Sequence, residues 1–337
     1  MYKATGDSYY LGKANEFWQN KDVGELSWDE KTAGAAILLA QLTGDDKYVS
    51  KAVSFCNKMA DTQQKTPKGM VWIQQWGPLR HASNVAFACL EAAKIADSRV
   101  DKEKYYQFAV NQIHYALGDT GRSFVVGYGT NPPQRPHHRS SSCPTNPSED
   151  CGWDDYNQSG PNPSILWGAL VGGPGADDSY TDYRGDYIKN EVACDYNAGF
   201  QSALAGLKTL SLDGSLPGQS EGTCSSTIST TESQSTTDST TVQTTSISQS
   251  TTSSSSSTTS SGSTTEKPSS GSCIGITKYN YDEVIEVSNL FYQAQRSGPL
   301  DVYGDFNHQK IPYRGDSCLT DGSDNGVDLT GGYFDGE

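Results

Sequence analysis

The chain has 337 residues, a hydrophobic content of 34% and a formal net charge of −15 at pH 7. That charge, with no run of Lys and Arg to offset it, argues against a surface for nucleic acid or an anionic membrane, and no apolar stretch approaches the ~20 residues that a membrane helix needs. The length allows one large domain or two ordinary ones with a real hydrophobic core.

A repeat of helical hairpins opens the chain. Residues 4–10 read Ala-Thr-Gly-Asp-Ser-Tyr-Tyr and residues 42–48 read Leu-Thr-Gly-Asp-Asp-Lys-Tyr, and an apolar-periodic segment follows each of them. In each copy we expect the Gly to end one helix and the Asp to cap the next. A third, degenerate copy begins at Ile95, ahead of a helix over 102–117. Such repeats predict stacked antiparallel helices, as in an α-solenoid or a closed α-toroid, and therefore an all-α fold.

The eight cysteines contain no CxxC pair and no Cys/His spacing suited to zinc, so no metal site is expected. Cys143 and Cys151 flank a short polar loop and could form a local disulfide in an exported protein. Cys56, Cys89 and Cys194 lie in helical patterns and are expected to be buried thiols.

The segment 127–139 reads Gly-Tyr-Gly-Thr-Asn-Pro-Pro-Gln-Arg-Pro-His-His-Arg. Its three prolines predict a rigid loop, because they remove backbone donors and restrict the residues that precede them. His137, His138 and Arg139 would suit a hydroxyl-rich or anionic ligand. The alternative is a surface loop whose cations pair with neighbouring carboxylates.

Acidic and aromatic residues surround the last helix expected before a change in composition, over about 187–210. Asp182 lies in the approach to this helix and Asp186 can cap it. Glu191 is expected in its first turns, with Asp195 and Tyr196 one turn further along. A glutamate in such surroundings is a candidate general acid. The alternative is an ordinary acidic helix N-terminus favoured by the helix dipole.

A polar segment follows that helix. Between Ser225 and Thr265, 32 of 41 residues are Ser or Thr. The segment has too few apolar residues to offset the entropy lost on ordering, so a disordered linker is expected. The composition suits O-glycosylation in a secreted protein or a plain polar linker, and Asn157-Gln-Ser159 is an N-glycosylation sequon. A further amphipathic helix is expected over 279–296, ahead of a tail rich in Gly and Asp.

Several of these segments resemble glycoside hydrolase family 9, whose members are chiefly endo-β-1,4-glucanases. Residues 123–139 resemble the family's first signature position for position, and 182–197 resemble the second. Residues 76–80 and 170–175 are similar to further family segments, so the resemblance covers nearly all of 1–210. It implies an (α/α)6 barrel.

The end of the chain resembles the beginning of the same catalytic domain. Residues 281–298 and 314–335 carry this second resemblance. It implies the C-terminal half of one catalytic domain over 1–215, a linker over 216–272 and the start of a second domain over 273–337, each barrel being incomplete. A window on a tandem array is favoured over a rearranged single domain. Asp335 matches the first Asp of the family's Asp-Ala-Gly-Asp segment, whose last Asp is the base that activates water, so the base is expected to be missing.

The resemblance also implies roles for individual residues. Glu191 matches the general acid, and Asp182 the signature aspartate upstream of it. His137 and Arg139 match a pair that hydrogen-bonds glucosyl hydroxyls. The remaining matches are the sugar platform Trp76, the cleft residues Arg80 and Tyr196, and Asp335 in the catalytic-water region of the second module.

The function implied is a secreted endo-β-1,4-glucanase that hydrolyses cellulose with inversion and needs no cofactor. Its partner would be a β-1,4-glucan chain, with neither nucleic acid nor membrane involved. With the base missing, 1–337 is expected to hydrolyse carboxymethylcellulose poorly or not at all. The alternatives are an inactive or cellulose-binding remnant of a tandem cellulase, and a mucin-like spacer.

Overall fold

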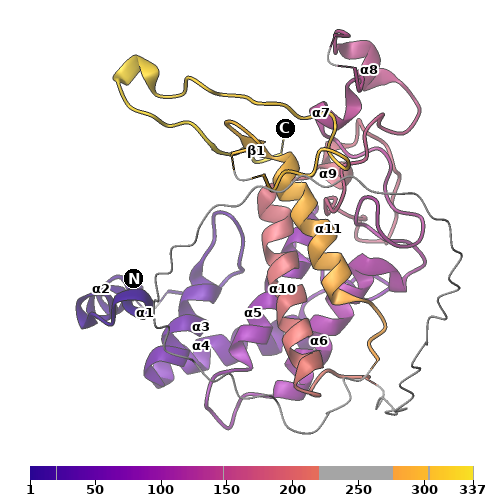
Figure 1. The fold of residues 1–337 in the computed structure, drawn as a ribbon. Helices are drawn as coiled ribbons and strands as arrows, with labels where there is room; N and C mark the ends of the chain where they lie inside the picture. The colour runs from indigo at the N-terminus through magenta and orange to yellow at the C-terminus, as the bar shows by residue number, and fades with distance from the viewer. Residues whose placement is uncertain (20, 147, 220–275, 303, 337) are drawn as a thin grey trace, which may run out of the picture.

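The computed structural model describes residues 1–19, 21–146, 148–219, 276–302 and 304–336. Helices dominate it, as predicted, and irregular segments gather at one end of the helical body (Figure 1). The predicted Ser/Thr-rich linker falls almost entirely on 220–275, outside the described residues.

The two TGD copies end and begin helices as predicted. Gly6 and Gly44 each close a helix in the left-handed conformation. The side chains of Asp7 and Asp45 then accept hydrogen bonds from the backbone N–H groups of the next helix. The four helices are α1 (Tyr2–Thr5), α2 (Ser8–Trp18), α3 (Thr32–Thr43) and α4 (Asp46–Asn57).

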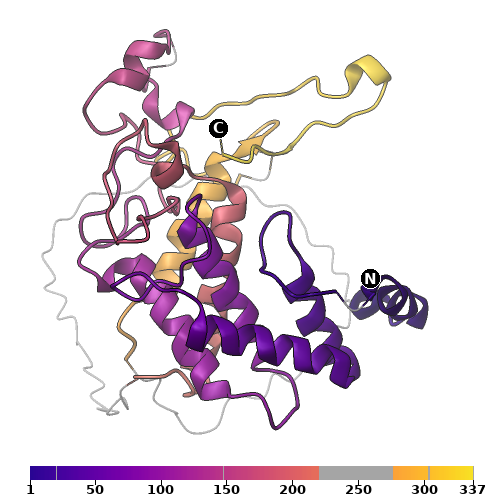
Figure 2. The same cartoon turned by 180° about the vertical axis from the view of Figure 1, so that it is seen from behind.

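The core lies around α5 (Pro78–Ala92), which packs against α6 (Lys102–His114) and α10 (Cys194–Leu212). Nearly every residue of α5 is buried, as expected for a helix enclosed by neighbours. Figure 2, which views the molecule from behind, shows α3 and α4 beside α5. Single π-helical turns, η1 (Lys58–Thr62) and η2 (Tyr115–Asp119), extend α4 and α6. In the third repeat the capping residue is Asp101.

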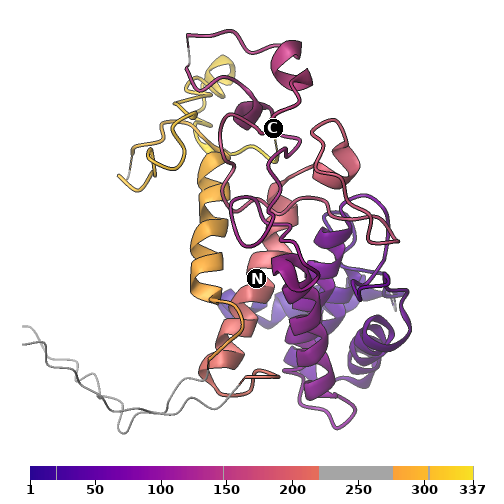
Figure 3. The ribbon, with the colours of Figure 1, turned by 90° about the vertical axis from the view of Figure 1, so that its right-hand side faces the viewer.

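Residues 120–193 are mostly loop and form the end of the body that carries the candidate site (Figure 3). They contain the short helices α7 (Arg139–Ser142), α8 (Trp153–Asn157) and α9 (Tyr187–Asn190). Isolated bridges tie the loops together, between Val125 and Leu170 and between His137 and Glu191. The second bridge joins the two signature segments directly.

The helix expected over 187–210 is broken, and the placement of Glu191 in its first turns is wrong. α9 ends at Asn190 and α10 begins at Cys194, and Glu191 between them has φ −58° and ψ 146°. The Gly172 N–H donates to the Glu191 carbonyl at 2.9 Å, and the His137 N–H donates to the Asn190 carbonyl at 2.8 Å. Hydrogen bonds to remote loops therefore replace the helical ones that a local pattern predicts.

Two disulfides are present among the described residues. Cys143 and Cys151 are bonded as predicted, with Cα atoms 5.2 Å apart. Cys56 and Cys89 are also bonded, with Cα atoms 5.5 Å apart, so the expectation of buried thiols is wrong for these two. They come from α4 and α5, whose packing brings facing helical positions within disulfide range. Cys194 and Cys318 are free.

The C-terminal segment, 276–336, packs onto the helices that precede it. Its helix α11 (Tyr281–Ala294) lies along α10 (Figures 1 and 3) and buries Val284 and Phe291. The Asn197 side chain donates to Ser288 Oγ at 3.0 Å. A Cβ on Gly168 would overlap the Val287 carbonyl, so α11 approaches a backbone position that only glycine leaves open.

Beyond α11 the segment is mainly irregular. It contains β1 (Arg296–Ser297), paired antiparallel with β2 (Gly332–Tyr333), and the 3-10 turn η3 (Ser323–Asn325). The assignment of 273–337 to a second module stays a prediction. Within the part of the chain that the structure describes, no helix combines the length and apolarity of a membrane span.

Candidate active site

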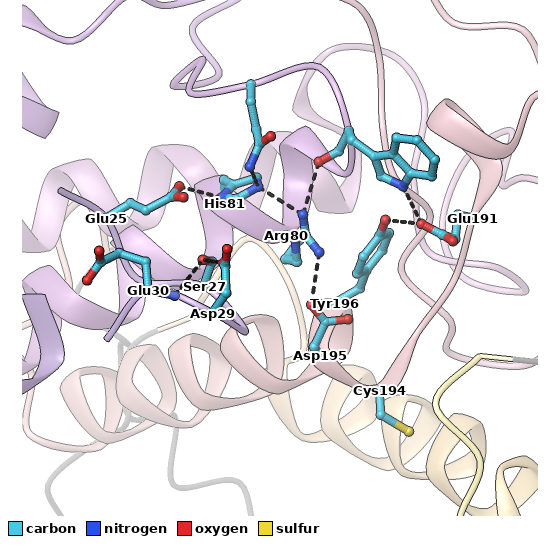
Figure 4. A network of polar contacts seen from close by, with 12 residues as sticks. Glu25, Ser27, Asp29, Glu30, Arg80, His81, Glu191, Cys194, Asp195 and Tyr196 are labelled. Atoms are coloured by element: carbon cyan, nitrogen blue, oxygen red, sulfur yellow. Dashed lines mark hydrogen bonds and ion pairs between the residues drawn. The ribbon is translucent and has the colours of Figure 1, made fainter. Parts of the chain in front are cut away.

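The carboxylate of Glu191 is held through one of its two oxygens. Trp76 Nε1 and the Tyr196 hydroxyl both donate to Oε2, each at 2.5 Å, and Figure 4 shows the tyrosine pointing at this carboxylate. In the described residues Oε1 has no hydrogen-bond partner. Burial, followed by the acceptor Glu191, raises the pKa of Tyr196, so the tyrosine keeps its proton and acts as the donor. One carboxyl oxygen is left available to a ligand.

Arg80 supports this arrangement from behind. Its guanidinium lies 4.9 Å from the Tyr196 ring centroid and donates to Asp195 Oδ2 at 3.0 Å and to the Trp76 carbonyl at 3.2 Å. Only 7% of Arg80 is exposed, so it acts here as a positioning residue, and its predicted contact with substrate stays a prediction. Burial raises the pKa of Asp195, and Arg80 opposes this effect.

The polar network continues into the core through His81 (Figure 4). Its Nε2 lies 3.0 Å from Arg80 Nη2, and its Nδ1 lies 2.9 Å from Glu25 Oε2. Burial and, after it, the Arg80 charge lower the pKa of His81 to about 4. His81 is therefore neutral near pH 7 and can accept from Arg80, which fixes the guanidinium beneath Tyr196.

His137 faces the site with a defined tautomer. Its Nδ1 lies 2.8 Å from the Arg184 carbonyl, and because a carbonyl only accepts, Nδ1 carries the proton and Nε2 of the neutral ring is an acceptor. Arg139, two residues on, is exposed. Its guanidinium has neither a hydrogen-bond nor an ion-pair partner among the described side chains and backbone. Both groups are thus available to a ligand.

His138 has a structural place in the fold. It is 3% exposed and caps α7, with Nδ1 accepting from the Ser141 N–H at 3.1 Å. Its Nε2 lies 3.1 Å from the side-chain amide of Gln295 in the C-terminal segment. The expectation that the His-His-Arg run suits a ligand stays a prediction for His137 and Arg139, while His138 is buried.

Asp182 and Asp335 lie near the site without contacting Glu191 through a hydrogen bond. The Asp182 carboxylate accepts from the backbone N–H groups of Gln134 and Arg135, at 2.8 and 3.0 Å, and so fixes the proline-rich loop. The Asp335 carbonyl accepts from the Cys194 N–H at 2.6 Å. Asp335 is also one of the charges that raise the pKa of Asp195, after burial, so the C-terminal segment reaches the N-terminus of α10.

Tyr187 is a further residue of the site, which the sequence patterns did not indicate. Its ring centroid lies 5.3 Å from that of Trp76 and 6.2 Å from that of His137, so it joins the two signature regions. Its position directly after the capping Asp186 was the available signal. In the described segments no group of three or more His, Cys, Asp and Glu side chains is arranged to hold a metal ion.

The family comparison decides what this arrangement is. The model of glycosyl hydrolase family 9 matches residues 1–204 and 281–336. The chain belongs to this family. Endoglucanase B of Cellulomonas fimi is 41% identical over 226 residues, covering 61% of this chain and 21% of that protein. An endoglucanase of Dictyostelium discoideum is 40% identical over 218 residues, covering 61% and 29%.

Solved structures of endoglucanases match as well. The termite enzyme from Nasutitermes takasagoensis has a TM-score of 0.59 and 52% identity, covering 62% of this chain and 48% of that one. CelQ of Clostridium thermocellum, solved with cellotriose, has a TM-score of 0.56 and 41% identity, covering 61% and 36%. This family 9 chain spans less than half the length of each of these proteins. The predicted (α/α)6 barrel, in incomplete form, is confirmed as its fold class.

Proposed function

We propose that this family 9 chain is part of an endo-β-1,4-glucanase that cleaves internal bonds of cellulose with inversion, and that Glu191 is its general acid. The observation that carries the proposal is the carboxyl group of Glu191, held through Oε2 by Trp76 and Tyr196 with Oε1 open to a ligand. The endoglucanase names of the relatives support the reaction. The cellotriose complex of CelQ supports the substrate class.

The proton would be transferred from Oε1 of Glu191 to the glycosidic oxygen of the leaving sugar. The two donors on Oε2 stabilise the carboxylate that this transfer produces, because they are already oriented toward it before the reaction. The indole of Trp76 is 40% exposed and offers a flat face to the apolar side of a glucosyl ring. His137 Nε2 can accept from a sugar hydroxyl, and Arg139 can donate to one.

Inversion also requires a second carboxylate, on the face of the sugar opposite the general acid, with a water molecule between that carboxylate and the sugar. Asp335 matches the first Asp of the family segment that supplies this base. We assign the base to none of the residues described above. Asp182 would support catalysis indirectly, by holding the loop that presents His137.

We further propose that the protein is secreted. The two disulfides, Cys56–Cys89 and Cys143–Cys151, support an oxidising environment. The sequon asparagine, Asn157, is exposed at the end of α8 and so accessible to a glycosylating enzyme. A β-1,4-glucan outside the cell is the proposed partner, and nothing in the proposal requires nucleic acid or a membrane.

The test separates the acid from the sugar-binding residues, in a polypeptide that carries this segment together with the base. Glu191→Gln keeps the shape and hydrogen bonds of the side chain but cannot donate a proton of suitable acidity, so kcat on cellulose should fall by about 100-fold or more while cello-oligosaccharide binding survives. An aryl glycoside with a good leaving group scarcely needs protonation and should restore the rate of this variant.

His137→Ala is the matched comparison. It removes a sugar contact and leaves the proton donor, so the activated substrate should not restore its rate. An equal response of the two variants to that substrate, or a Glu191→Gln variant that retains most of its activity on cellulose, would contradict the assignment of roles.

A further inference from the structure

A row of polar side chains connects the candidate acid with the segment 21–31, between α2 and α3 (Figure 4). Tyr196 contacts Glu191, and Arg80 lies against the Tyr196 ring. His81 lies beside Arg80, and Glu25 of the segment approaches His81 from its other side. Glu25 is therefore joined to the acid through side chains, although the two residues are far apart in the sequence.

Few groups set the orientation of the Arg80 guanidinium. Nη1 donates to Asp195 Oδ2 at 3.0 Å, and Nη2 donates to the Trp76 carbonyl at 3.2 Å. Nη2 also lies 3.0 Å from His81 Nε2. Arg80 Nε is buried and has no hydrogen-bond partner in the described part of the chain. The imidazole is thus one of only three acceptors, among the described residues, that hold the guanidinium beneath Tyr196.

His81 can accept from Arg80 in only one of its tautomers. Because a guanidinium only donates, Nε2 must be the acceptor, and the proton of the neutral ring is then on Nδ1. Nδ1 lies 2.9 Å from Glu25 Oε2, but the two atoms are not aligned for a hydrogen bond. Glu25 therefore acts on the ring through its charge, which favours the tautomer with the proton on Nδ1.

The groups around His81 favour the neutral ring. The ring is fully buried, and the Arg80 charge adds to the effect of burial, while Asp29 opposes both. The side-chain amide of Gln74 lies 2.8 Å from the same Nε2 atom. A proton on Nε2 would face the guanidinium and remove the acceptor that both neighbours approach.

We propose that Glu25 and His81 are positioning residues for Glu191. Glu25 selects the tautomer of His81, and His81 holds Arg80. Arg80 in turn keeps the Tyr196 hydroxyl on the carboxyl oxygen Oε2. The catalytic consequence rests on the proposed function, whereas the effect on the geometry around Glu191 does not. Neither positioning residue has a hydrogen bond to Glu191 in the described structure.

The first measurement needs no activity and uses the 1–337 chain. It follows the NMR resonance of the Trp76 indole N–H, which donates to Glu191 and is assigned by its loss in Trp76→Phe. His81→Gln can place an amide oxygen near the position of Nε2 and should keep the wild-type resonance. His81→Asn is shorter, reaches only the Nδ1 side, and should move the resonance toward that of a free indole.

The second measurement tests Glu25, which is only partly buried. Glu25→Gln keeps the shape of the side chain and removes its charge, so it should lower the fraction of His81 with the proton on Nδ1, as read from ¹⁵N shifts. Asp22→Asn is the matched control, because Asp22 belongs to the same segment, is exposed and pairs with Lys51. It should leave the ¹⁵N shifts of His81 as in the wild type. Equal shifts in the two variants would overturn the role of Glu25.

The catalytic consequence is measured in a polypeptide that carries this segment together with the base. His81→Asn should lower kcat on cellulose about tenfold, the value of about one hydrogen bond. KM should change little, because no substrate contact is removed, and His81→Gln should recover most of kcat.

The outcomes separate this inference from the proposed function. If the wild-type polypeptide does not hydrolyse cellulose, the proposed function fails, while the Trp76 resonance still decides whether His81 positions the site. If that resonance is the same in His81→Asn as in the wild type, the positioning role is overturned and the proposed function stands. The role is also overturned if His81→Gln and His81→Asn lose the resonance alike, because His81 would then only fill the core.

Discussion

At the scale of single residues, the close approach of the Tyr196 ring to the Gly77 backbone decides whether Glu191 is held. Gly77 precedes α5 with φ 63°, and a Cβ built on it would lie 2.8 Å from Cζ of Tyr196. That separation is too short for any real Cβ. The absence of a side chain at this position is therefore what lets the Tyr196 hydroxyl reach Glu191 Oε2.

Gly77→Ala should consequently damage the site as well as the fold. Gly44→Ala is the matched control, because Gly44 has φ 65° and open space around its Cβ position. Both variants should lose about 1–2 kcal/mol of unfolding free energy from the left-handed backbone. Only Gly77→Ala should also displace Tyr196 and weaken cellotetraose binding. Thermal melts and binding titrations on the two variants check this, and equal binding by both would refute it.

At the scale of elements, the sequence predicts features that depend on neighbouring residues, but not features that depend on residues far apart in the chain. The Gly and Asp of each TGD copy act on their immediate neighbours, so residues 6–7 and 44–45 could be assigned from sequence. The break at Glu191 depends on hydrogen bonds from Gly172 and His137, which lie 19 and 54 positions earlier in the chain. The candidate site could be named through the family resemblance, while its geometry required the fold.

The Cys56–Cys89 disulfide is a second non-local feature, and it joins α4 to α5 across 33 residues. Loop-closure entropy predicts that removing it with Cys56→Ala/Cys89→Ala costs about 4 kcal/mol of unfolding free energy. Cys143→Ala/Cys151→Ala opens a separation of only 8 residues and should cost about 2.5 kcal/mol. Urea titrations measure both, and a larger loss for the shorter loop would contradict the loop-closure explanation.

At the scale of the whole molecule, buried histidines lie at the junction between the C-terminal segment and the rest. His114 Nε2 lies 2.7 Å from the Tyr281 hydroxyl of α11, and His138 Nε2 lies 3.1 Å from the Gln295 amide that follows α11. Burial lowers the pKa of each to about 4. Both rings are therefore neutral in the folded chain near pH 7.

The charged groups around each ring modify this effect without reversing it. Asp119 raises the pKa of His114 and Lys278 lowers it, and both come after burial in size. The hydrogen bond to Gln295 raises the pKa of His138 and the Arg314 charge lowers it, and both come after burial in size. Because Lys278 and Arg314 belong to the C-terminal segment, its docking adds positive charge beside both rings and makes their protonation harder.

Acid should therefore release the C-terminal segment from the buried histidines at a higher pH than the pH at which α3 and α4 unfold. Each ring has a lower pKa when folded than its usual 6.5, so the unfolded or undocked state binds the proton first. Each neutral ring makes its full contribution to the stability of the docked, folded state above pH 6.5. That contribution falls by up to about 3 kcal/mol for each ring as the pH falls toward 4. Hydrogen exchange on the 1–337 chain, corrected for intrinsic rates, should show α11 losing protection at a higher pH than α3 and α4.

The control replaces each ring by an amide that cannot be protonated in this range. His114→Gln and His138→Asn retain hydrogen-bonding groups near the original nitrogen positions. Together they should flatten the pH dependence of α11 protection between pH 6.5 and 4, even if they lower that protection overall. The prediction is wrong if the double variant keeps the wild-type pH dependence, or if α11, α3 and α4 lose protection together. In the second case the chain would unfold in acid as one cooperative unit, since docking and folding would then share a single transition.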